Sequence, residues 1–220
     1  MGYFITLEGP DGGGKTTQAQ LLVCELGKQG YDVLLTREPG GTDIGDEIRA
    51  ILHDRRHTMM DARTEILLYS ASRSQHVVQT IIPALEAGRV VISDRYADST
   101  LAYQGYGRGL DLDMLRVITS YATRDLEPDL TLCLDIAPED GLRRRRENDG
   151  EWNRLDAESL EFHHRTRAGY LELAGRSPSR WVIIDAARPA PDVFAQISEV
   201  VSARLAEMRI STEIWDQRRT

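Results

Sequence analysis

The sequence predicts an α/β fold with a mainly parallel sheet, and two features of the chain lead to that prediction. First, five short apolar runs alternate with segments of helical periodicity, as in chains built from repeated strand and helix units. Second, each run is nearly continuous rather than alternating with polar residues, which is typical of strands covered on both faces. The expected strands are Tyr3–Glu8, Asp32–Arg37, Arg89–Asp94, Leu130–Ile136 and Trp181–Asp185.

Helices are expected between these strands and after the last one. The first helical pattern stops at Gly30, a residue type that commonly caps the C-terminal end of a helix. The long third pattern should kink or divide at Pro83, because proline lacks the N–H that a helix interior needs. The expected helices are Thr16–Gln29, Ile44–His53, Ala62–Ala87, Asp113–Asp125, Ala157–Gly175 and Asp192–Met208.

The chain is expected to form one domain. Its 220 residues, 41% of them hydrophobic, suffice for one core, and the length does not demand two. We expect this domain to span residues 1–210. A charged stretch at about 143–156 (RRRRENDGEWNRLD) should form a short mobile lid, and residues 211–220 a polar C-terminal tail.

Composition limits the partners of the protein. A formal net charge of −8 argues against a nucleic-acid partner, because nucleic-acid binders usually carry a basic surface. No apolar stretch approaches the roughly 20 residues that span a bilayer, and the first apolar run is too short for a signal peptide. The two cysteines, Cys24 and Cys133, lie in apolar runs, which favours buried thiols in a reducing compartment over a disulfide. We therefore expect a cytoplasmic protein with no membrane partner.

The first expected strand leads into a phosphate-binding loop. Gly9-Pro10-Asp11-Gly12-Gly13-Gly14-Lys15-Thr16 matches G-x-x-x-x-G-K-[ST] without mismatch. Small residues let backbone N–H groups turn toward a phosphate, and the following helix directs its positive end there. A chance glycine-rich turn is the alternative, but the loop follows a strand and opens a helix. We expect residues 9–17, through Thr17, to bind a nucleoside triphosphate such as ATP, with Lys15 on the β- and γ-phosphates and Thr16 on Mg²⁺. The motif alone is shared by switches, motors and kinases.

Two further strand ends should meet this loop. The third strand ends in Asp94-Arg95, and an acid at the carboxyl end of a strand beside the loop is where a magnesium-organising carboxylate should lie. Arg95 could bridge donor and acceptor phosphates, although the pair could also be a structural ion pair. The second strand exits into the glycine-rich segment 36–42 (TREPGGT) at the same sheet edge. Together they predict a P-loop three-layer α/β/α fold with a five-stranded parallel sheet and a ligand cleft at this edge.

Several segments together resemble the thymidylate kinase family of nucleoside monophosphate kinases. The resemblance covers roughly residues 3–190, and its most specific part is SDRYADSTLAYQGYGRG at 93–109. The other segments are LEGPDGGGKTTQ at 7–18, TREPGGT at 36–42, LLYSASRSQH at 67–76 and HRTRAGYLELA at 164–174.

The resemblance implies roles for individual residues. Asp11 matches an acid beside the acceptor phosphate and Arg95, while Arg49 and Arg95 match arginines that grip that phosphate. Tyr69 matches an aromatic that stacks on thymine, and Arg73, one helical turn later, matches a donor to the base. Thr100 and Gln104 match residues that read the pyrimidine edge, and Tyr103 lies where the family crowds a ribose 2′-hydroxyl. The expected acceptor-site residues are Glu38, Arg49, Tyr69, Arg73, Arg95, Thr100, Tyr103 and Gln104.

Arginines of the expected lid are further catalytic candidates. Such a run at 143–146 is usually a solvated helix face, but phosphoryl transfer needs cations around its transition state. Some thymidylate kinases carry an arginine inside the P-loop, where this chain has Gly12 and Gly13, so the resemblance to the bacterial type implies that the lid supplies it. We expect Arg145, Arg146 and Arg154 to act there. The family pattern Asp-Arg-Ile/Leu-Glu is altered here to Asn153-Arg154-Leu155-Asp156, which leaves the docking of the lid open.

The sequence thus predicts an enzyme that uses ATP and Mg²⁺ to phosphorylate dTMP to dTDP in dTTP biosynthesis. By resemblance we also expect a homodimer. Catalysis should involve Asp11, Lys15, Arg95 and the lid arginines, and Mg²⁺ should lie at Thr16 and Asp94. A kinase for another pyrimidine monophosphate or a deoxynucleoside is the nearest alternative, and a nucleotide-binding switch is the alternative from another class.

Overall fold

In the computed structural model the sheet is five-stranded and wholly parallel, with the order β2-β3-β1-β4-β5. The structure describes residues 2–147 and 152–217, with side chains as far as Met208. The strands are β1 (Tyr3–Glu8), β2 (Val33–Arg37), β3 (Val90–Asp94), β4 (Leu130–Asp135) and β5 (Trp181–Asp185). These bounds agree with the five predicted strands to within one residue at each end.

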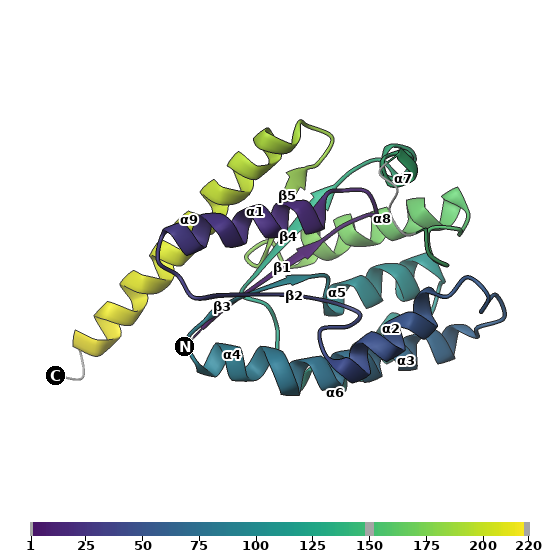
Figure 1. Ribbon diagram of the computed structural model, residues 1–220, viewed down its shortest axis with the longest axis horizontal. Coiled ribbons are helices and arrows are strands. Elements are labelled where there is room, and N and C mark those ends of the chain that lie inside the picture. Colours follow the sequence, from purple (N-terminus) through teal and green to yellow (C-terminus); the bar gives the residue numbers. More distant parts are fainter. Residues whose placement is uncertain (1, 148–151, 218–220) are drawn as a thin grey trace.

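Helices cover both faces of the sheet, so the α/β/α prediction is confirmed (Figure 1). On one face, α1 (Lys15–Lys28) and α9 (Ala190–Gln217) pack on alternate strand residues such as Ile5 and Leu7. On the other face, Phe4 and Val91 pack beneath the helical segments of residues 77–86, and Cys133 packs near α8 (Leu160–Arg176). Strands buried on both sides explain the continuous apolar runs of the sequence.

The predicted helix at 62–87 is a continuous helical segment with three parts. It consists of α3 (Ala62–His76), a π-helical segment η1 (Val77–Ile81) and α4 (Ile82–Glu86). Pro83 lies in the first turn of α4, and the wider π turn comes directly before it. The missing N–H of Pro83 is therefore accommodated by a change of helical type, as expected at such positions. The remaining predicted helices correspond to α2 (Asp43–His53) and α6 (Leu112–Thr123).

Three helical segments differ from the sequence predictions. Residues 97–107, singled out as a motif, form a short helix α5 (Ala97–Thr100) and a π-helical segment η2 (Leu101–Gly107). The arginines at 143–146 end a further helix, α7 (Pro138–Glu147), so the predicted lid begins as helix; its residues 148–151 lie outside the described part of the chain. Helix α9 continues to Gln217, through most of the predicted polar tail, of which residues 218–220 are not described.

Within residues 2–147 and 152–217, no helix combines the length and the apolar character that crossing a bilayer requires.

Candidate active site

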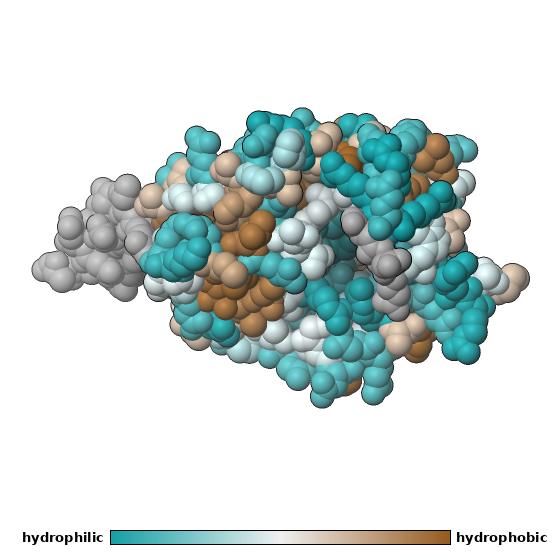
Figure 2. All heavy atoms as spheres, turned by 45° about the horizontal axis from the view of Figure 1, so that its top comes forward, coloured by the Kyte–Doolittle hydropathy of each residue, from teal (hydrophilic) through white to brown (hydrophobic). Residues whose placement is uncertain are grey.

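A cavity of about 860 Å³ opens at the carboxyl ends of β1, β2 and β3. This is the edge at which ligands bind in open parallel sheets, beside the point where the strand order reverses. Its walls come from the P-loop, the exit of β2, helices α2 and α3, residues 94–104 and the arginines of α7. Figure 2 shows a largely hydrophilic face of the molecule that is hollowed near its middle. The P-loop and the predicted acceptor residues therefore share one cavity.

The P-loop has the close backbone approaches that glycine permits. Gly12 has a φ of 77°, and a Cβ atom there would lie 2.0 Å from the backbone oxygen of Gly141 in α7. A side chain at position 12 would therefore push away the helix that carries the lid arginines. Residues 11, 12 and 14–17 line the cavity, whereas Gly13 packs against Leu134 of β4.

Lys15 is buried at the first turn of α1 and points back across its own loop. Its Nζ donates to the backbone oxygens of Gly9 at 3.0 Å and Pro10 at 2.7 Å. Burial, together with the nearby charge of Arg95, lowers the pKa of Lys15 to about 8. The ammonium is thus held where an incoming phosphate would replace carbonyl partners with a stronger, charged one.

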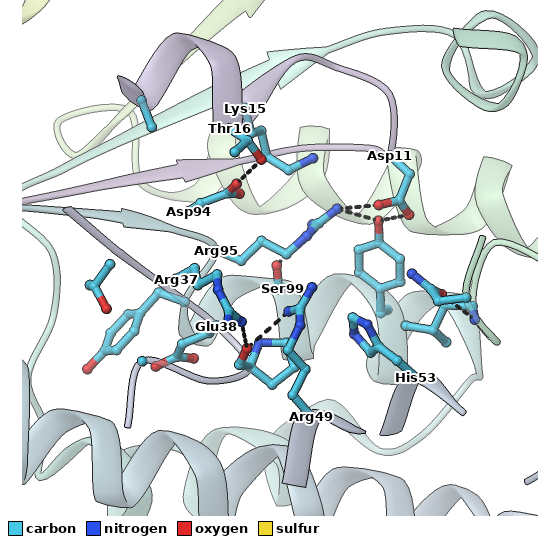
Figure 3. Close-up of a pocket in the computed structure, with 18 of the residues that line it drawn as sticks. Asp11, Lys15, Thr16, Arg37, Glu38, Arg49, His53, Asp94, Arg95 and Ser99 are labelled. Carbon is cyan, nitrogen blue, oxygen red and sulfur yellow. Dashed lines mark hydrogen bonds and ion pairs between the residues drawn. The ribbon is translucent and has the colours of Figure 1, made fainter. Parts of the chain in front are cut away.

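Thr16 and Asp94 meet where a magnesium ion is expected. The Thr16 hydroxyl donates to Asp94 Oδ2 at 2.5 Å, and both side chains line the cavity (Figure 3). Mg²⁺ prefers oxygen ligands and is usually held by one or two carboxylates together with substrate phosphates and water. A hydroxyl and a carboxylate converging at the P-loop fit that ligand set.

Arg95 and Asp11 form the ion pair at the centre of the cavity. Arg95 Nη2 donates to Asp11 Oδ1 at 2.7 Å, and the Tyr103 hydroxyl donates to Asp11 Oδ2 at 2.6 Å (Figure 3). Burial alone would raise the pKa of Asp11, but the charges of Arg95 and Lys15 hold it well below its ordinary value. Arg95 also has a φ of 71°, unusual for a residue with a side chain. Such backbone strain concentrates at functional sites.

The other side of Arg95 rests on hydroxyl groups above a buried carboxylate. Arg95 Nη1 donates to Ser99 Oγ at 3.2 Å and to the Tyr170 hydroxyl at 3.0 Å. Both hydroxyls donate in turn to Glu8 Oε2, at 2.6 and 2.9 Å. Burial, with a contribution from Asp98, raises the pKa of Glu8 to about 7. None of these three residues was predicted as a site residue. Ser99 lies only four residues after Arg95, in the segment singled out at 93–109, but Glu8 and Tyr170 reach this cluster from distant parts of the chain.

Two arginines converge on the loop after β2. Arg49 Nη1 and Arg37 Nη1 each donate to the Pro39 backbone oxygen at 3.0 Å (Figure 3). Both side chains line the cavity, beside the predicted phosphate-gripping Arg95. Arg37 was not predicted as a site residue, although it lies in the TREPGGT segment that was singled out.

Helix α3 supplies a wall of the cavity with Tyr69 and Arg73. Arg73 is 2% exposed and donates to Glu38 Oε2 at 2.7 Å, to Thr100 Oγ1 at 2.9 Å and to the Tyr96 backbone oxygen at 3.0 Å. A guanidinium has five N–H groups, so Nη1 and Nη2 each keep one beyond these bonds. Tyr69, one turn earlier, is buried and lines the same cavity. Together they offer a flat ring and a donor on one helical face.

The side chains of the three predicted lid arginines point to different parts of the molecule. Arg145 lines the main cavity and donates to Asp156 Oδ2 at 2.5 Å. Arg146 instead stacks over the Trp152 ring at 4.9 Å and lines a second, smaller cavity. Arg154 pairs with Glu65 of α3 and donates to the Leu52 backbone oxygen at 3.2 Å. Of the three predicted lid arginines, the structure thus brings only Arg145 to the lining of the main cavity.

This chain is similar to known proteins over most of its length. The family model for thymidylate kinase matches residues 7–197, most of the chain. The chain belongs to the thymidylate kinase family. A thymidylate kinase of Roseiflexus castenholzii is 50% identical over 220 residues, covering 94% of this chain and 96% of the relative. One of Geobacillus thermodenitrificans is 50% identical over 205 residues, covering 93% of this chain and 91% of the relative.

A solved thymidylate kinase confirms the fold. The crystal structure of the Ehrlichia chaffeensis enzyme superposes with a TM-score of 0.76 at 33% identity, covering 91% of this chain and 98% of that one. The sequence-based assignment to the thymidylate kinase family, and to its P-loop nucleoside monophosphate kinase fold, is therefore confirmed.

Within this thymidylate kinase domain, the altered lid pattern has a structural explanation. Asn153 Oδ1 accepts from the backbone N–H groups of Leu155 at 2.8 Å and Asp156 at 3.1 Å, so it caps the turn that follows. The shorter carboxylate of Asp156 reaches Arg145 and also accepts from the Asn153 N–H at 2.9 Å. The two substituted residues thus shape the turn next to Arg145.

Two histidine side chains that were not predicted as site residues line or support the cavity. His53 lines the cavity, and burial together with Arg49 lowers its pKa to about 3. His76, fully buried, bonds Glu38 Oε1 at 3.0 Å and Thr36 Oγ1 at 2.6 Å, so it supports the carboxylate that holds Arg73. No spacing in the sequence signals either role, because each depends on packing between distant segments.

Proposed function

We propose that this protein transfers the γ-phosphoryl group of ATP to dTMP and forms dTDP. The observation that carries the proposal is one cavity with a P-loop at one side and an arginine-lined pocket with an aromatic wall at the other. Membership of the thymidylate kinase family supports this reaction. A nucleotide switch would have no use for the arginine-lined acceptor side of this cavity.

Phosphoryl transfer between two phosphates requires the protein to align the two groups and to offset their negative charge. The nucleophile is an oxygen of the dTMP phosphate, which is mostly ionised at neutral pH because its second pKa is about 6. No strong general base is then needed, and catalysis rests on positioning and electrostatic stabilisation. Lys15 serves the donor phosphates, while Arg49 and Arg95 hold the acceptor.

Asp11 keeps Arg95 in place before the acceptor arrives. Its carboxylate accepts a hydrogen bond from Arg95 Nη2. The Tyr103 hydroxyl accepts from the same Nη2 and donates to the carboxylate, so the three groups bond one another. The dTMP phosphate can share this guanidinium, since Arg95 faces both the P-loop and the acceptor pocket. Arginine suits such a position because its planar fork binds phosphate oxygens in pairs.

The pyrimidine lies against α3 in this proposal. Tyr69 stacks on the base, and Arg73 donates to its edge with Thr100 and Gln104 nearby. The Tyr103 ring lies beneath the sugar, where a ribose hydroxyl would be crowded. A site whose buried polar groups match one base rejects others strongly, because a mismatch leaves those groups unpaired.

The proposed cofactor is Mg²⁺ held through Thr16 and Asp94. When bound with ATP, the ion would offset charge on the β- and γ-phosphates. Arg145, which lines the cavity from α7, adds positive charge on the lid side, and we retain Arg146 and Arg154 as proposed lid residues.

A homodimer is proposed on the surface formed by α3 and α6, which pack against each other. This surface exposes four large apolar side chains: Leu67, Met114, Val117 and Tyr121, which are 59%, 62%, 70% and 88% exposed. Apolar groups clustered on neighbouring helices commonly mark an interface. A second copy of the chain is the proposed partner at this surface. The proposed location of the protein is the cytoplasm.

Incubation with ATP, Mg²⁺ and each nucleoside monophosphate in turn, followed by chromatography, tests the function. We expect dTDP as the main product with dTMP. Faster turnover of uridine or cytidine monophosphate would favour the other pyrimidine kinases. ATP hydrolysis without any phosphorylated nucleotide product would favour the switch.

A further inference from the structure

Glu65 is a buried carboxylate of α3 that the proposed reaction does not use. It lies one helical turn before Tyr69 and is 1% exposed. Its Oε1 accepts from Gln104 Nε2 at 2.8 Å and from Arg108 Nε at 2.7 Å. Its Oε2 accepts from Arg108 Nη2 at 2.9 Å and from Arg154. Every described partner of this side chain is a donor.

The charge on Glu65 makes it an acceptor only. Burial opposes ionisation, but the hydrogen bonds and charge of Arg108, with the charge of Arg154, hold the pKa of Glu65 below its ordinary value. An ionised carboxylate offers no proton. Gln104 must therefore turn its NH₂ group toward Glu65, because the opposite orientation would bring two oxygens together.

This orientation decides which amide atom is left for a ligand. Gln104 is 2% exposed and lines the cavity with Tyr69, Arg73 and Thr100. With Nε2 committed to Glu65, the carbonyl Oε1 is the amide atom directed away from that carboxylate. A carbonyl oxygen accepts hydrogen bonds and cannot donate one.

We propose that Glu65 is a specificity-determining positioning residue, which fixes the Gln104 carbonyl to accept from the N3–H of thymine. This inference rests on the proposed function and deepens it. Thymine and uracil both carry a proton on N3, whereas N3 of neutral cytosine is an acceptor. Cytosine would place two acceptors face to face, and the buried mismatch would be costly. Arg73 alone could not make this distinction at N3, since it only donates.

Glu65→Gln tests the proposal. The Oε2 position receives two charged donors, Arg108 Nη2 and Arg154, so the new amide oxygen should lie there. The NH₂ group then takes the Oε1 position against Gln104, at the loss of the bond from Arg108 Nε. Gln104 should then turn its own oxygen to position 65 and its NH₂ group to the base. We expect the ratio of kcat/KM for dTMP to that for dCMP to fall at least about tenfold. The dTMP to dUMP ratio should stay within about twofold, because both bases carry the N3 proton.

Glu158→Gln is the matched control. Glu158 accepts from Arg108 Nη2 at 2.9 Å but does not contact Gln104 through any described bond. Its replacement should leave both ratios and the KM for ATP unchanged. The proposal is wrong if Glu65→Gln retains the dTMP to dCMP ratio, or if both ratios fall together. A wild-type protein that does not phosphorylate dTMP would instead refute the proposed function.

Nuclear magnetic resonance of the wild-type protein gives a test that does not require a folded variant at position 65. The Gln104 side-chain amide can be assigned by its loss in Gln104→Met. We expect slow solvent exchange of its protons both without dTMP and with dTMP bound, since Nε2 stays on Glu65 in both states. Loss of protection on dTMP binding would overturn the proposal.

Discussion

At the residue scale, the site depends on which charges are buried beside one another. Lys15 and Arg95 are cations with a pair of acids, Asp11 and Glu8, close to them. Asp11 stays ionised because cations surround it, whereas Glu8 lies deeper and burial raises its pKa to about 7. Asp11 therefore pairs with Arg95 directly as a full negative charge, whereas Glu8 acts from the other side of Arg95, through two hydroxyl groups, and is only partly ionised at neutral pH.

The lowered pKa of Lys15 predicts how ATP binding depends on pH. In the free protein, burial and Arg95 bring this pKa to about 8, so the positive charge is lost as the pH rises through that value. ATP phosphates favour the charged form, so binding should take up a proton above pH 8 and weaken by up to about tenfold per pH unit. Titration of ATP between pH 8 and 9.5 measures this slope, above the range where Glu8 titrates.

Lys15→Arg is the control for this slope, because arginine stays charged throughout the range. Whatever its absolute affinity, this variant should bind ATP with little dependence on pH. An equally flat profile for the wild-type protein would show that Lys15 keeps its proton up to pH 9.5 and would contradict this prediction.

At the scale of elements, helix α7 assigns different tasks to neighbouring arginines. Arg144 and Arg145 both line the main cavity, but Arg145 pairs with Asp156, whereas Arg144 donates to the Ala186 backbone oxygen at 2.8 Å. Arg143 faces solvent and pairs with Asp140 in its own helix. Consecutive helical residues point about 100° apart, so a run of arginines cannot act as one group.

Arg145→Lys should lower kcat by about tenfold or more, because one charged donor aimed at the transferring phosphate commonly has at least this effect. Lysine keeps a positive charge opposite the buried Asp156, so the thermal midpoint should change little. Arg143→Lys, in the same turn but outside the cavity, is the control and should keep the wild-type kcat. Equal effects of the two substitutions would return the arginine run to a solvated helix face.

At the scale of the whole molecule, the edge of the sheet that carries the cavity and the proposed dimer surface are separate. The cavity opens at the carboxyl ends of the strands, whereas the apolar side chains of α6 lie on the outer side of the helical layer. Helix α3 belongs to both, since Tyr69 faces the cavity and Leu67 is exposed. A dimer on α3 and α6 would therefore bury one face of the helix that supplies the proposed base contacts.

Val117→Asp should convert the proposed dimer to a monomer, because a charge would have to be buried among apolar side chains. Light scattering after size exclusion should then change from twice the chain mass of 24.8 kDa to that mass. Met59→Asp is the control, since Met59 is 93% exposed in the segment between α2 and α3. A wild-type mass of one chain would contradict the dimer.

The sequence by itself determined the fold class, the strands, the P-loop and the family. These follow from local information: continuous apolar runs, a motif of fixed spacing, and segments that match the family without gaps in their key residues. The exact ends of the helices and the π-helical segments were less predictable from the sequence. The π turns at 77–81 and 101–107 depend on what packs against them, as Val77 and Ile81 do against Phe4 and Val91.

Only the tertiary structure decided which side chains act on one another. Glu8 lies under Arg95, His76 behind Glu38, and Glu65 against Gln104, and each pair spans at least 38 residues of sequence. It also separated Arg145 from Arg146, which the sequence treats alike. Hydrogen bonds and buried charges act over a few ångströms in space, so contacts between distant segments leave no spacing that a sequence pattern could reveal.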